Sequence, residues 1–466
     1  MIALTLDLGT SATKAALWDG PRLTALTRAP LETSHPAPGR AEQVPDEWWT
    51  SVVDACAGLR AVEPDRYDAI DVLGFTAARE TFAPFDASLD PLGPGILWSD
   101  QRAIDELGDL GDPLPFRAQT GVMLTPACAA AKMRWIATHE PDAWRETRWV
   151  LAPRDLVFAR ITSELLTDET LASRTGLYDL YGALLAPDDA DRLPPVVPST
   201  TALPTSTGAM DLKLRAGIPV VIGAGDRACE ILGVGGSTHA PMVSWGTTAN
   251  VSVPDHGPAS ALPTIAQVSR GALGGYVVEA GLSAAGAAIA WLARLTGRSH
   301  DDVLTAARTA APGASGVVAL PWFAGARAPW WQPGAQAAFL GLSDAHGPAD
   351  LARALVEGVA YDVARCLELV APAAQELELA GGGAADVLWR QIVAGVTGLP
   401  VVRRSIDDAA SVGARLLIAS AVDEVMALDD VNPVLSRDEP DTKLVRVYSS
   451  LRDTADALAS AVISSE

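Results

Sequence analysis

The stretch LTLDLGTSATKAALWD, residues 4–19, holds two runs of β-forming residues on either side of a small turn, Gly-Thr-Ser at 9–11. This pattern predicts two strands joined by a tight turn. An aspartate, Asp7, stands where the first run ends. A stretch of the same design, PMVSWGTTANVSVP at residues 241–254, places Gly-Thr-Thr at 246–248. One such hairpin is common in proteins, but a pair of them, each heading an α/β segment, favours two lobes that share a ligand.

The rest of the chain alternates predicted strands and helices. The apolar residues of PDEWWTSVVDACAGLRAV, residues 45–62, have helical spacing, and the strand IPVVIGAG near the middle of the chain is again followed by a predicted helix. Strands alternating with helices indicate an α/β fold. Because 466 residues exceed one ordinary core, at least two lobes are expected, with a boundary near residues 236–241.

Composition excludes several classes of partner. The formal net charge of −22 repels polyanions, so we expect neither nucleic acid nor an anionic membrane surface as a partner. A small phosphorylated ligand stays allowed, because backbone amides bind phosphate without a net positive charge. No apolar run reaches the about 18 residues of a membrane span, and no signal peptide is recognised at the start. The four cysteines are far apart, which predicts reduced thiols in a cytoplasmic protein without a structural zinc site.

Two aspartates are candidates for chemistry. Asp7 and Asp226 each end an apolar strand beside a glycine-rich turn. Either one alone is often only a cap, but the pair in one site suits phosphoryl transfer, with one carboxylate near Mg²⁺ and the other accepting the proton of the attacking hydroxyl. The turn Gly-Gly-Gly-Ala at 381–384 lets a ligand approach the backbone closely. No Gly-x-x-x-x-Gly-Lys-Ser/Thr motif is present, so hairpin turns and helix ends would hold a nucleotide.

In their order and spacing these stretches resemble the FGGY carbohydrate kinases of the actin-like ATPase superfamily. The resemblance runs from DLGTSATKAALWD through ILWSDQRA, GAGDRACEILGVG, SWGTTA and LPWFAGARAPWWQPG to LAGGGAADVLWRQIVAGVTGLPV. It implies an α/β fold of two actin-like, ribonuclease H-like lobes with ATP and sugar in the cleft between them. The N-terminal lobe, residues 1–238, would bind sugar and carry the first phosphate loop. The C-terminal lobe, residues 239–435, would bind the nucleotide, and residues 436–466 would form a helical extension.

The resemblance also implies roles for individual residues. Asp226 matches the catalytic base and also stands near the metal, and Asp7 matches the magnesium-associated aspartate. The expected nucleotide-site residues are Thr10, Ser11, Thr13 and Lys14 in the first phosphate loop, Gly246, Thr247 and Thr248 in the second, and Gly286, Gly382, Gly383 and Ala384 in the nucleotide pocket. The expected sugar-site residues are Arg79, Glu80, Trp98, Asp226 and Arg227. The implied cofactors are ATP and Mg²⁺.

The sugar-site motifs do not all match one subfamily. Arg79-Glu80 resembles the Gln-Arg-Glu-Thr motif of glycerol kinases, with Ala78 in place of the glutamine, whereas xylulokinases have a Met-His pair there. Ala127 stands where glycerol kinases have a tyrosine, and ILWSDQRA is closer to xylulokinase or gluconokinase. The expected reaction is the ATP-dependent phosphorylation of a hydroxyl of a small sugar, foremost a ketopentose such as D-xylulose.

Other interpretations stay open on the sequence. The substrate could instead be glycerol, a longer polyol or an aldonate such as gluconate. Outside this class, the alternatives are a non-catalytic sugar or nucleotide sensor, against which the retained Asp7 and Asp226 argue, and an actin-like ATPase that acts on protein partners. Arg79 and Glu80 could also form a surface ion pair, and Trp98 could be a core residue. A homodimer is left open.

Overall fold

The computed structural model describes residues 1–257 and 265–464 and divides the chain into two compact units. Unit 1 contains Met1–Gly233, His256–Val277 and Ala409–Val431, and unit 2 contains Val234–Asp255, Val278–Asp408 and Asn432–Glu466. Residues 256–277 and 409–431 thus belong to the first compact unit, although they follow the expected boundary at residue 238. The functional lobes expected at 1–238 and 239–435 stay a prediction. In the described ranges, no helix is both long enough and apolar enough to cross a membrane.

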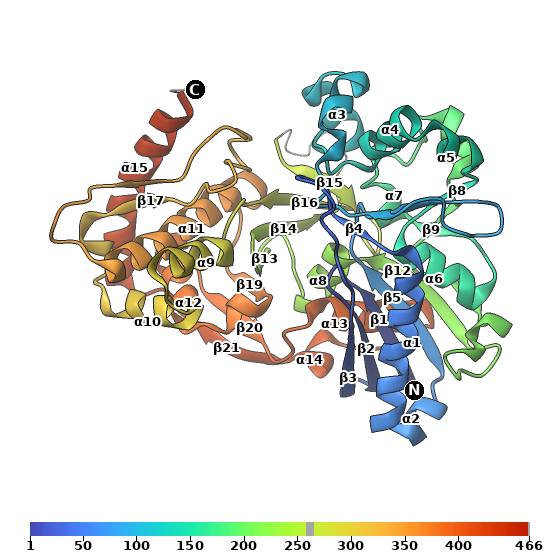
Figure 1. The fold of residues 1–466 in the computed structure, drawn as a ribbon. Helices are drawn as coiled ribbons and strands as arrows, with labels where there is room; N and C mark the ends of the chain where they lie inside the picture. The colour runs from blue at the N-terminus through green and yellow to red at the C-terminus, as the bar shows by residue number, and fades with distance from the viewer. Residues whose placement is uncertain (258–264, 465–466) are drawn as a thin grey trace. The chain divides into compact units, whose positions relative to one another are not determined.

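The central sheet of unit 1 is built around the predicted hairpin, which is confirmed. Strands β1 and β2 pair antiparallel across the turn at residues 9–11, and β1 also pairs parallel with β5, which pairs parallel with β12 (Figure 1). The sheet order is β11-β12-β5-β1-β2-β3. The strands are β1 Ile2–Leu8, β2 Ala12–Asp19, β3 Arg22–Pro30, β5 Val72–Ala77, β11 Ala202–Pro204 and β12 Pro219–Gly225.

Helices cover both faces of this sheet because successive side chains of a strand point to opposite faces. Leu73 and Phe75 of β5 belong to a core cluster that includes residues of α1, Pro45–Val62, and α6, Pro153–Thr162. Gly74 faces the other way, where a Cβ atom would lie 2.5 Å from Cγ1 of Ile418 in α13, Ala409–Ala421. Helix α13 therefore packs directly on the backbone of β5.

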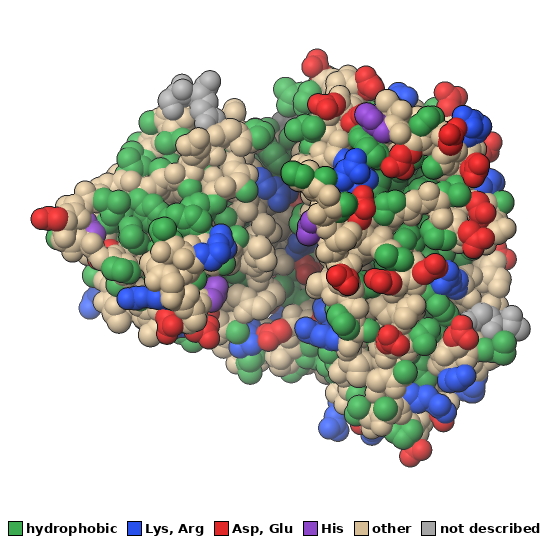
Figure 2. Space-filling model, viewed as in Figure 1, with side chains coloured by type: hydrophobic (Ala, Val, Ile, Leu, Met, Phe, Trp, Pro, Cys, Tyr) green, Lys and Arg blue, Asp and Glu red, His purple; other side chains and the backbone are tan. Residues whose placement is uncertain are grey.

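Smaller elements of unit 1 surround this sheet. The strands are β4 Glu42–Gln43, β6 Ala83–Phe85, β7 Gly95–Ile96, β8 Trp149–Leu151, β9 Thr167–Asp168, β10 Val196–Val197 and β15 Gln267–Arg270. The helices are α2 Pro64–Asp68, α3 Pro113–Thr120, α4 Ala129–His139, α5 Pro141–Glu146, α7 Glu169–Ala172, α8 Asp226–Val234 and α14 Leu428–Val431, with a 3-10 helix at Arg102–Leu110. Acidic side chains are spread widely over the surface of this unit, in keeping with the net charge of −22 (Figure 2).

Unit 2 has the same arrangement of a hairpin beside parallel strands, as predicted. Strands β13 and β14 pair antiparallel across the turn at 246–248, while β13, β19 and β20 pair parallel. The strands of this unit follow the order β16-β14-β13-β19-β20-β21. Their bounds are β13 Met242–Trp245, β14 Ala249–Asp255, β16 Tyr276–Gly281, β19 Leu377–Ala380, β20 Val401–Arg404 and β21 Val434–Asp438, with the separate pair β17 Val318–Leu320 and β18 Ala338–Leu340.

The helices of unit 2 complete its layers. They are α9 Gly286–Thr296, α10 His300–Thr309, α11 Pro348–Val370, α12 Val387–Thr397 and α15 Thr442–Ser464. Helix α15 lies within the segment expected to be a helical extension, of which residues 465–466 lie outside the described residues. Its Tyr448 is fully buried and accepts a hydrogen bond from Arg353 of α11. A mixed α/β fold of two units is thereby confirmed.

Candidate active site

Three parallel strands of unit 1 end at one edge of the sheet and bring the predicted residues together. Asp7 lies near the carboxyl end of β1, Arg79 and Glu80 follow β5, and Asp226 follows β12. Ligands of open α/β sheets bind outside the carboxyl ends of the strands, where loops and helix N-termini converge. The topology therefore places the candidate carboxylates and Arg79 at the edge where chemistry is expected.

Asp226 is the first residue of α8, and two neighbouring groups contact Oδ1 of its carboxylate. Arg79 Nε lies 3.2 Å from Asp226 Oδ1, and the backbone N–H of Arg227 donates to the same oxygen at 2.7 Å. The side chain of Asp226 is 38% exposed. A carboxylate with this exposure is accessible to a ligand. Arg227 itself extends to Glu230, one helical turn along α8.

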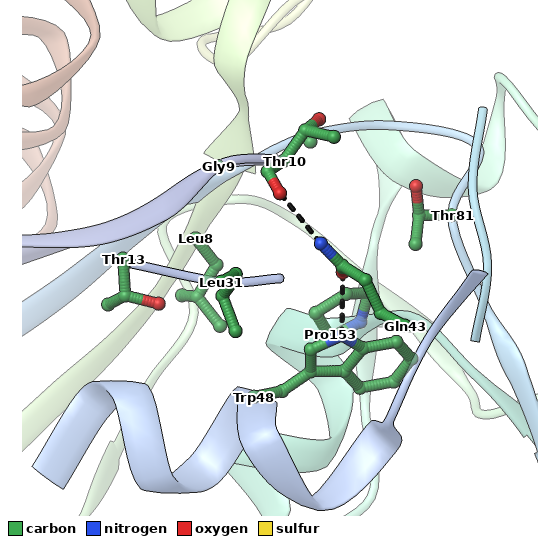
Figure 3. A pocket seen from close by; sticks show the side chains of 10 residues that line it. Leu8, Gly9, Thr10, Thr13, Leu31, Gln43, Trp48, Thr81 and Pro153 are labelled. Atoms are coloured by element: carbon green, nitrogen blue, oxygen red, sulfur yellow. Dashed lines mark hydrogen bonds between the residues drawn. The ribbon is translucent and has the colours of Figure 1, made fainter. Parts of the chain in front are cut away.

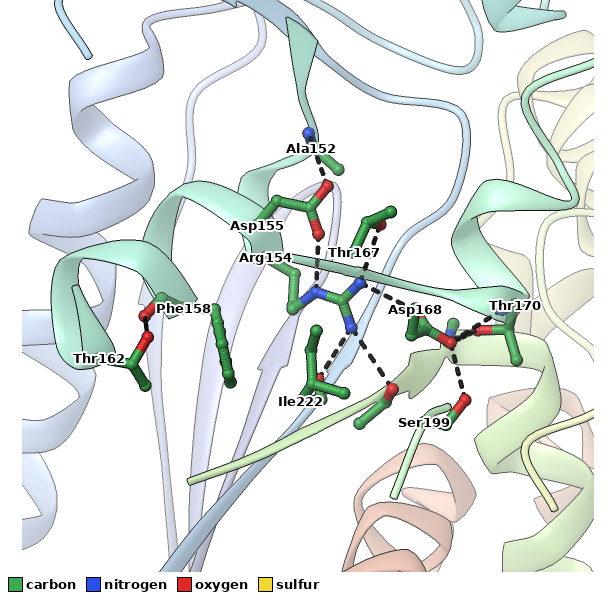
Figure 4. A network of polar contacts seen from close by, with 12 residues as sticks. Ala152, Arg154, Asp155, Phe158, Thr162, Thr167, Asp168, Thr170, Ser199 and Ile222 are labelled. Carbon is green, nitrogen blue, oxygen red and sulfur yellow. Dashed lines mark hydrogen bonds and ion pairs between the residues drawn. The ribbon is translucent and has the colours of Figure 1, made fainter. Parts of the chain in front are cut away.

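A buried arginine organises β12, the strand that Asp226 follows (Figure 4). Arg154 of α6 has no exposed side-chain surface and pairs with two carboxylates, Asp155 at 2.9 Å and Asp168 at 2.8 Å. Its Nη1 also donates to the carbonyl oxygen of Ile222 in β12 at 2.8 Å. Charge-assisted bonds of this kind are strong and directional. Arg154 therefore fixes β12 four residues before the candidate base.

The same network reaches the residue next to Asp226. Asp168 accepts hydrogen bonds from the backbone N–H and the hydroxyl of Thr170, and from the hydroxyl of Ser199 at 2.8 Å. The Thr170 hydroxyl oxygen accepts from the backbone N–H of Gly225 at 2.7 Å. The sequence analysis did not single out these residues. The signal was present, because an Arg-Asp pair directly before the apolar run LVFA in PRDLVFARIT is unusual unless the charges are paired.

Arg79 and Glu80 each have a charged partner elsewhere in the fold. Arg79 contacts Asp226, and the Glu80 carboxylate accepts from Arg174, whose side chain is 5% exposed. The alternative of a simple surface ion pair does not describe these half-buried residues. Glu80 also has a φ of +67°, a conformation that non-glycine residues rarely adopt and that clusters at functional sites.

Trp98 is not a core residue, because it is 42% exposed. Its indole Nε1 donates to the hydroxyl of Thr10 at 3.1 Å. A predicted sugar-site residue and a predicted phosphate-loop residue are thus in direct contact. The exposed part of the indole is available to stack on an apolar face of a ligand.

The first predicted phosphate loop is held from below by a glutamine (Figure 3). Gln43 Nε2 donates to the carbonyl oxygen of Thr10 at 2.7 Å, while its Oε1 accepts from the indole of the fully buried Trp48 at 3.0 Å. Both ends of the amide are therefore engaged and its orientation is determined. Sequence reasoning missed Gln43, since nothing in EQVPDEWW marks it as a loop support.

The other residues of this loop point in different directions. Ser11 is exposed, whereas Thr13 is fully buried with its hydroxyl 2.7 Å from that of Ser51 in α1, so its side chain supports the loop from beneath. Lys14 Nζ lies 2.8 Å from Asp7 Oδ2, directly across the β1–β2 pair. The two charges that were expected to face the phosphates and the metal are thus paired with each other.

In unit 2, most of the predicted nucleotide residues line one pocket. Its walls contain Gly246, Thr247, Gly286, Gly382 and Gly383. Thr248 is not among the lining residues, and Ala384 is buried beside the pocket at 1% exposure. The lining residues that the sequence analysis did not name are Trp245, Ala287, Ala290, His300, Asp301, Leu304, Ala385, Asp386 and Trp389. An apolar pocket with few polar groups is the usual form of a small-molecule site.

The second hairpin turn and α9 are joined through their backbones. Gly286 N–H donates to the carbonyl oxygen of Gly246 at 3.0 Å, and Ala287 N–H donates to that of Thr247 at 2.9 Å. A Cβ atom on Gly286 would lie 2.9 Å from the Gly246 oxygen, so only glycine permits this approach without a shift. The glycine at 286 therefore fixes the turn against the helix.

Two adjacent glycines of this pocket allow a matched test of whether it binds the nucleotide. A methyl group on Gly382 would meet nothing within 4 Å, whereas one on Gly383 would lie 2.2 Å from Cδ1 of Trp245. We expect Gly382→Ala to leave the melting temperature unchanged and to raise KM for ATP about fivefold or more, because about 1 kcal/mol of overlap with a ligand has that effect. Gly383→Ala is expected to lower stability by about 1–3 kcal/mol through overpacking.

Calorimetry and steady-state kinetics on both variants separate these effects. An unchanged KM for ATP in Gly382→Ala would mean that the nucleotide does not approach this face. An unchanged melting temperature in Gly383→Ala would contradict the packing of Trp245 described above.

The two aspartates at one edge of the unit 1 sheet are the candidate metal ligands. No group of three or more His, Cys, Asp or Glu side chains in residues 1–257 and 265–464 is arranged to hold a metal ion. Mg²⁺ in phosphoryl-transfer sites is commonly held by one or two carboxylates together with substrate phosphates and water. Asp7 and Asp226, at the same edge of one sheet, fit that smaller requirement.

Comparison with known proteins covers nearly the whole chain. Residues 2–233 match the N-terminal domain, and residues 242–422 the C-terminal domain, of the FGGY family of carbohydrate kinases. The chain is 31% identical to a xylulose kinase of Escherichia coli (strain K12), with 96% of each chain aligned, and 31% identical to a glycerol kinase of Alkalilimnicola ehrlichii, with 90% of each aligned. The crystal structure of a xylulose kinase from Rhodospirillum rubrum superimposes with a TM-score of 0.90 at 27% identity, covering 99% of each chain.

Proposed function

Because this chain belongs to the FGGY family of carbohydrate kinases, we propose that it phosphorylates a hydroxyl of a ketopentose such as D-xylulose. Members of this family are sugar kinases that use ATP as the phosphate donor, and their substrates are small sugars or polyols. The observation that carries the proposal is the meeting of Asp226, Arg79 and Glu80 at the carboxyl ends of β12 and β5. These groups supply a base, a cation and a hydroxyl-binding carboxylate at one edge.

In this proposal, Asp226 accepts the proton of the substrate hydroxyl on Oδ2. The hydroxyl oxygen forms a bond to the γ-phosphorus of ATP, the bond from that phosphorus to the bridging β–γ oxygen breaks, and ADP leaves. Arg79 and the Arg227 N–H hold Oδ1, so the carboxylate cannot rotate away from the hydroxyl. A base fixed in this way contributes about 10²–10⁴-fold to rate.

The phosphates of ATP would be held by backbone groups and by the few polar side chains of the two hairpin turns. In this proposal, Thr10 and Ser11 are the phosphate-contacting residues of unit 1, and Gly246 and Thr247 are those of unit 2. Asp7 and Asp226 would hold Mg²⁺, which supplies charge neutralisation at the β- and γ-phosphates when bound. Lys14, now paired with Asp7, is the adjacent cation of this loop.

Glycerol is the second candidate substrate. It is favoured by Arg79-Glu80, which resembles the glycerol-kinase motif, and by the similarity to glycerol kinases. The ketopentose is favoured by Ala127, because a methyl group in place of tyrosine leaves room for a longer chain, and by the similarity to xylulose kinases along 96% of the chain. Longer polyols and aldonates would fit the same space.

A coupled ADP-release assay over ketoses, polyols and aldonates tests this proposal. We expect kcat/KM for the best ketopentose to exceed that for glycerol at least tenfold, because a site built to pair hydroxyls rejects substrates that leave its polar groups unpaired. Glu80→Ala should narrow the difference, whereas Glu164→Ala, at an exposed glutamate of the same unit, should not.

Three outcomes would count against the proposal in different ways. Glycerol as the best substrate would select the second candidate. Equal effects of Glu80→Ala and Glu164→Ala would remove Glu80 from the sugar site. Sugar binding without ADP release would favour the sensor interpretation.

The cellular location and the oligomeric state of the protein are also proposals. A kinase of small sugars needs the ATP pool of the cytoplasm, and all four cysteines are buried free thiols, as expected for that compartment. A homodimer stays a prediction.

A further inference from the structure

The two segments that carry the predicted sugar-site residues run antiparallel to each other in unit 1. Phe82 N–H donates to the carbonyl oxygen of Ile96 at 3.3 Å, and Ile96 N–H donates to that of Phe82 at 2.8 Å. In a regular antiparallel pair, the next residues to exchange backbone hydrogen bonds would be Glu80 and Trp98. These are the two residues proposed to face the sugar.

The pairing stops at this point. Glu80 has a φ of +67°, which turns its backbone out of the extended conformation. Trp98 N–H donates instead to the side-chain hydroxyl of Thr81 at 3.2 Å. The carbonyl oxygen of Glu80, which would accept from Trp98 N–H in a regular pair, therefore needs another donor, because an unsatisfied backbone group away from water is costly. The Leu97 carbonyl oxygen accepts from the backbone N–H of Asp100 at 3.1 Å.

One lysine supplies the donor for Glu80 and also contacts the segment that carries Trp98. Lys132, in the first turns of α4, donates from Nζ to the carbonyl oxygen of Glu80 and, at 3.0 Å, to that of Leu97. Its side chain has no exposed surface, and Nζ lies 5.5 Å from the centre of the Phe82 ring. Lys132 thus joins the two segments beyond the last backbone pair.

The surroundings of Lys132 are mixed in charge. Burial lowers the pKa of Lys132 to about 8, against the opposing effects of Glu80, Cys128 and Asp100, while Arg102 lowers it further. The lysine is therefore a donor whose charge changes within the working range of an enzyme assay. Lys14, Lys213 and Lys443 are the other lysines of a chain that is otherwise rich in arginine. A compact ammonium reaches two neighbouring carbonyl oxygens in a space that a planar guanidinium fills differently.

We propose that Lys132 is a positioning residue for the sugar site, which holds Glu80 and Trp98 at a fixed separation and thereby sets the KM for sugar. The proposal rests on the function proposed above, in which Glu80 and Trp98 face the substrate. Lys132 acts through the backbone of these residues and touches no reacting atom. Its loss is expected to affect sugar binding far more than nucleotide binding, because its partners belong to the sugar-site segments.

The test compares Lys132→Met, Lys132→Arg and the control Lys443→Met with the unmodified protein. Lys443 is an exposed lysine of α15. The sugar is whichever substrate the unmodified enzyme uses best, so failure of the ketopentose proposal is seen separately in the unmodified protein. We expect Lys132→Met to raise KM for sugar at least tenfold, since a small misplacement of substrate-binding groups has effects of this size. The KM for ATP should change less than about threefold. Lys132→Arg should recover part of this loss, and Lys443→Met should have no effect.

Two further readouts separate positioning from a structural role. In the unmodified enzyme, KM for sugar should rise as pH passes about 8, because deprotonation weakens the charge-assisted bonds, and this rise should be absent in Lys132→Met. Between about pH 8 and 10.5, the stability of the unmodified protein should rise relative to that of Lys132→Met, because the unfolded lysine keeps its proton over that range while the folded one has lost it.

Several results would overturn the proposal. A lower kcat with an unchanged KM for sugar in Lys132→Met would indicate a structural role only. A pH dependence of KM that persists in this variant would assign the titration to another group. If Lys132→Met does not fold, the same measurements on Lys132→Arg test the proposal. If neither variant folds, Lys132 contributes to the stability of the fold and not to the specificity for sugar.

Discussion

Replacing Asp226 by asparagine is expected to lower kcat by about 10²–10⁴-fold, the usual contribution of a positioned general base. The amide is nearly isosteric, and its oxygen can still accept the Arg227 N–H bond that holds Oδ1 at 2.7 Å. What is lost is the ability of the other atom to take a proton. The contact with Arg79 is partly exposed, so its loss contributes little to stability.

The measurement is steady-state kinetics with ATP binding and melting temperature recorded in parallel. Asp54→Asn, at an exposed aspartate of α1, is the matched control and should behave as the unmodified enzyme. A kcat for Asp226→Asn within a few-fold of the unmodified value at neutral pH would falsify the assignment of the base. A loss of ATP binding alone would move Asp226 from the proton transfer to the nucleotide or the metal.

The largest expected effect on stability comes from Arg154. Arg154→Met should lower the free energy of unfolding of unit 1 by about 3–5 kcal/mol, because it leaves the carboxylates of Asp155 and Asp168 buried without their cation. Burial already raises the pKa of Asp155, although Arg154 lies beside it. Without the arginine, this carboxyl is expected to take up a proton. Because domains are stable by only about 5–15 kcal/mol, such a loss is a large fraction of the total.

Arg160→Met provides the control on the same helix. Arg160 contacts Asp46 at 3.1 Å with both side chains partly exposed, so its loss should cost about 0–1 kcal/mol. Urea unfolding and amide hydrogen exchange at Gly225 measure the two effects, the first globally and the second at the end of β12. An equal stability of the two variants, or unchanged protection at Gly225 in Arg154→Met, would contradict the network described here.

Local features of the site could be predicted because they depend on residues close in sequence. The turns at 9–11 and 246–248 follow from small residues between β-forming runs, and both hairpins are confirmed. Five of the predicted nucleotide residues line the pocket of unit 2. Asp226 was placed after an apolar strand, where the structure has it as the first residue of α8.

The environment of individual side chains was harder to predict. The burial of Thr13 and the exposure of Trp98 depend on what α1 and the segment after β7 pack against. Thr13 was expected at the ligand, and the structure directs its side chain to Ser51 instead. Gln43 and Arg154 were not recognised, since their partners come from other parts of the chain.

The sequence by itself determined the α/β class, the two hairpin turns, the family, and the aspartates at the ends of apolar strands, because strand and turn preferences act over a few neighbouring residues. Only the tertiary structure decided the partners of the charges. Glu80 meets Arg174 across 94 residues of chain, and Lys132 meets the Glu80 carbonyl across 52. Such pairs form when packing brings distant segments together and removes water, so that each buried charge must find the opposite charge or a dipole that the fold has placed within reach.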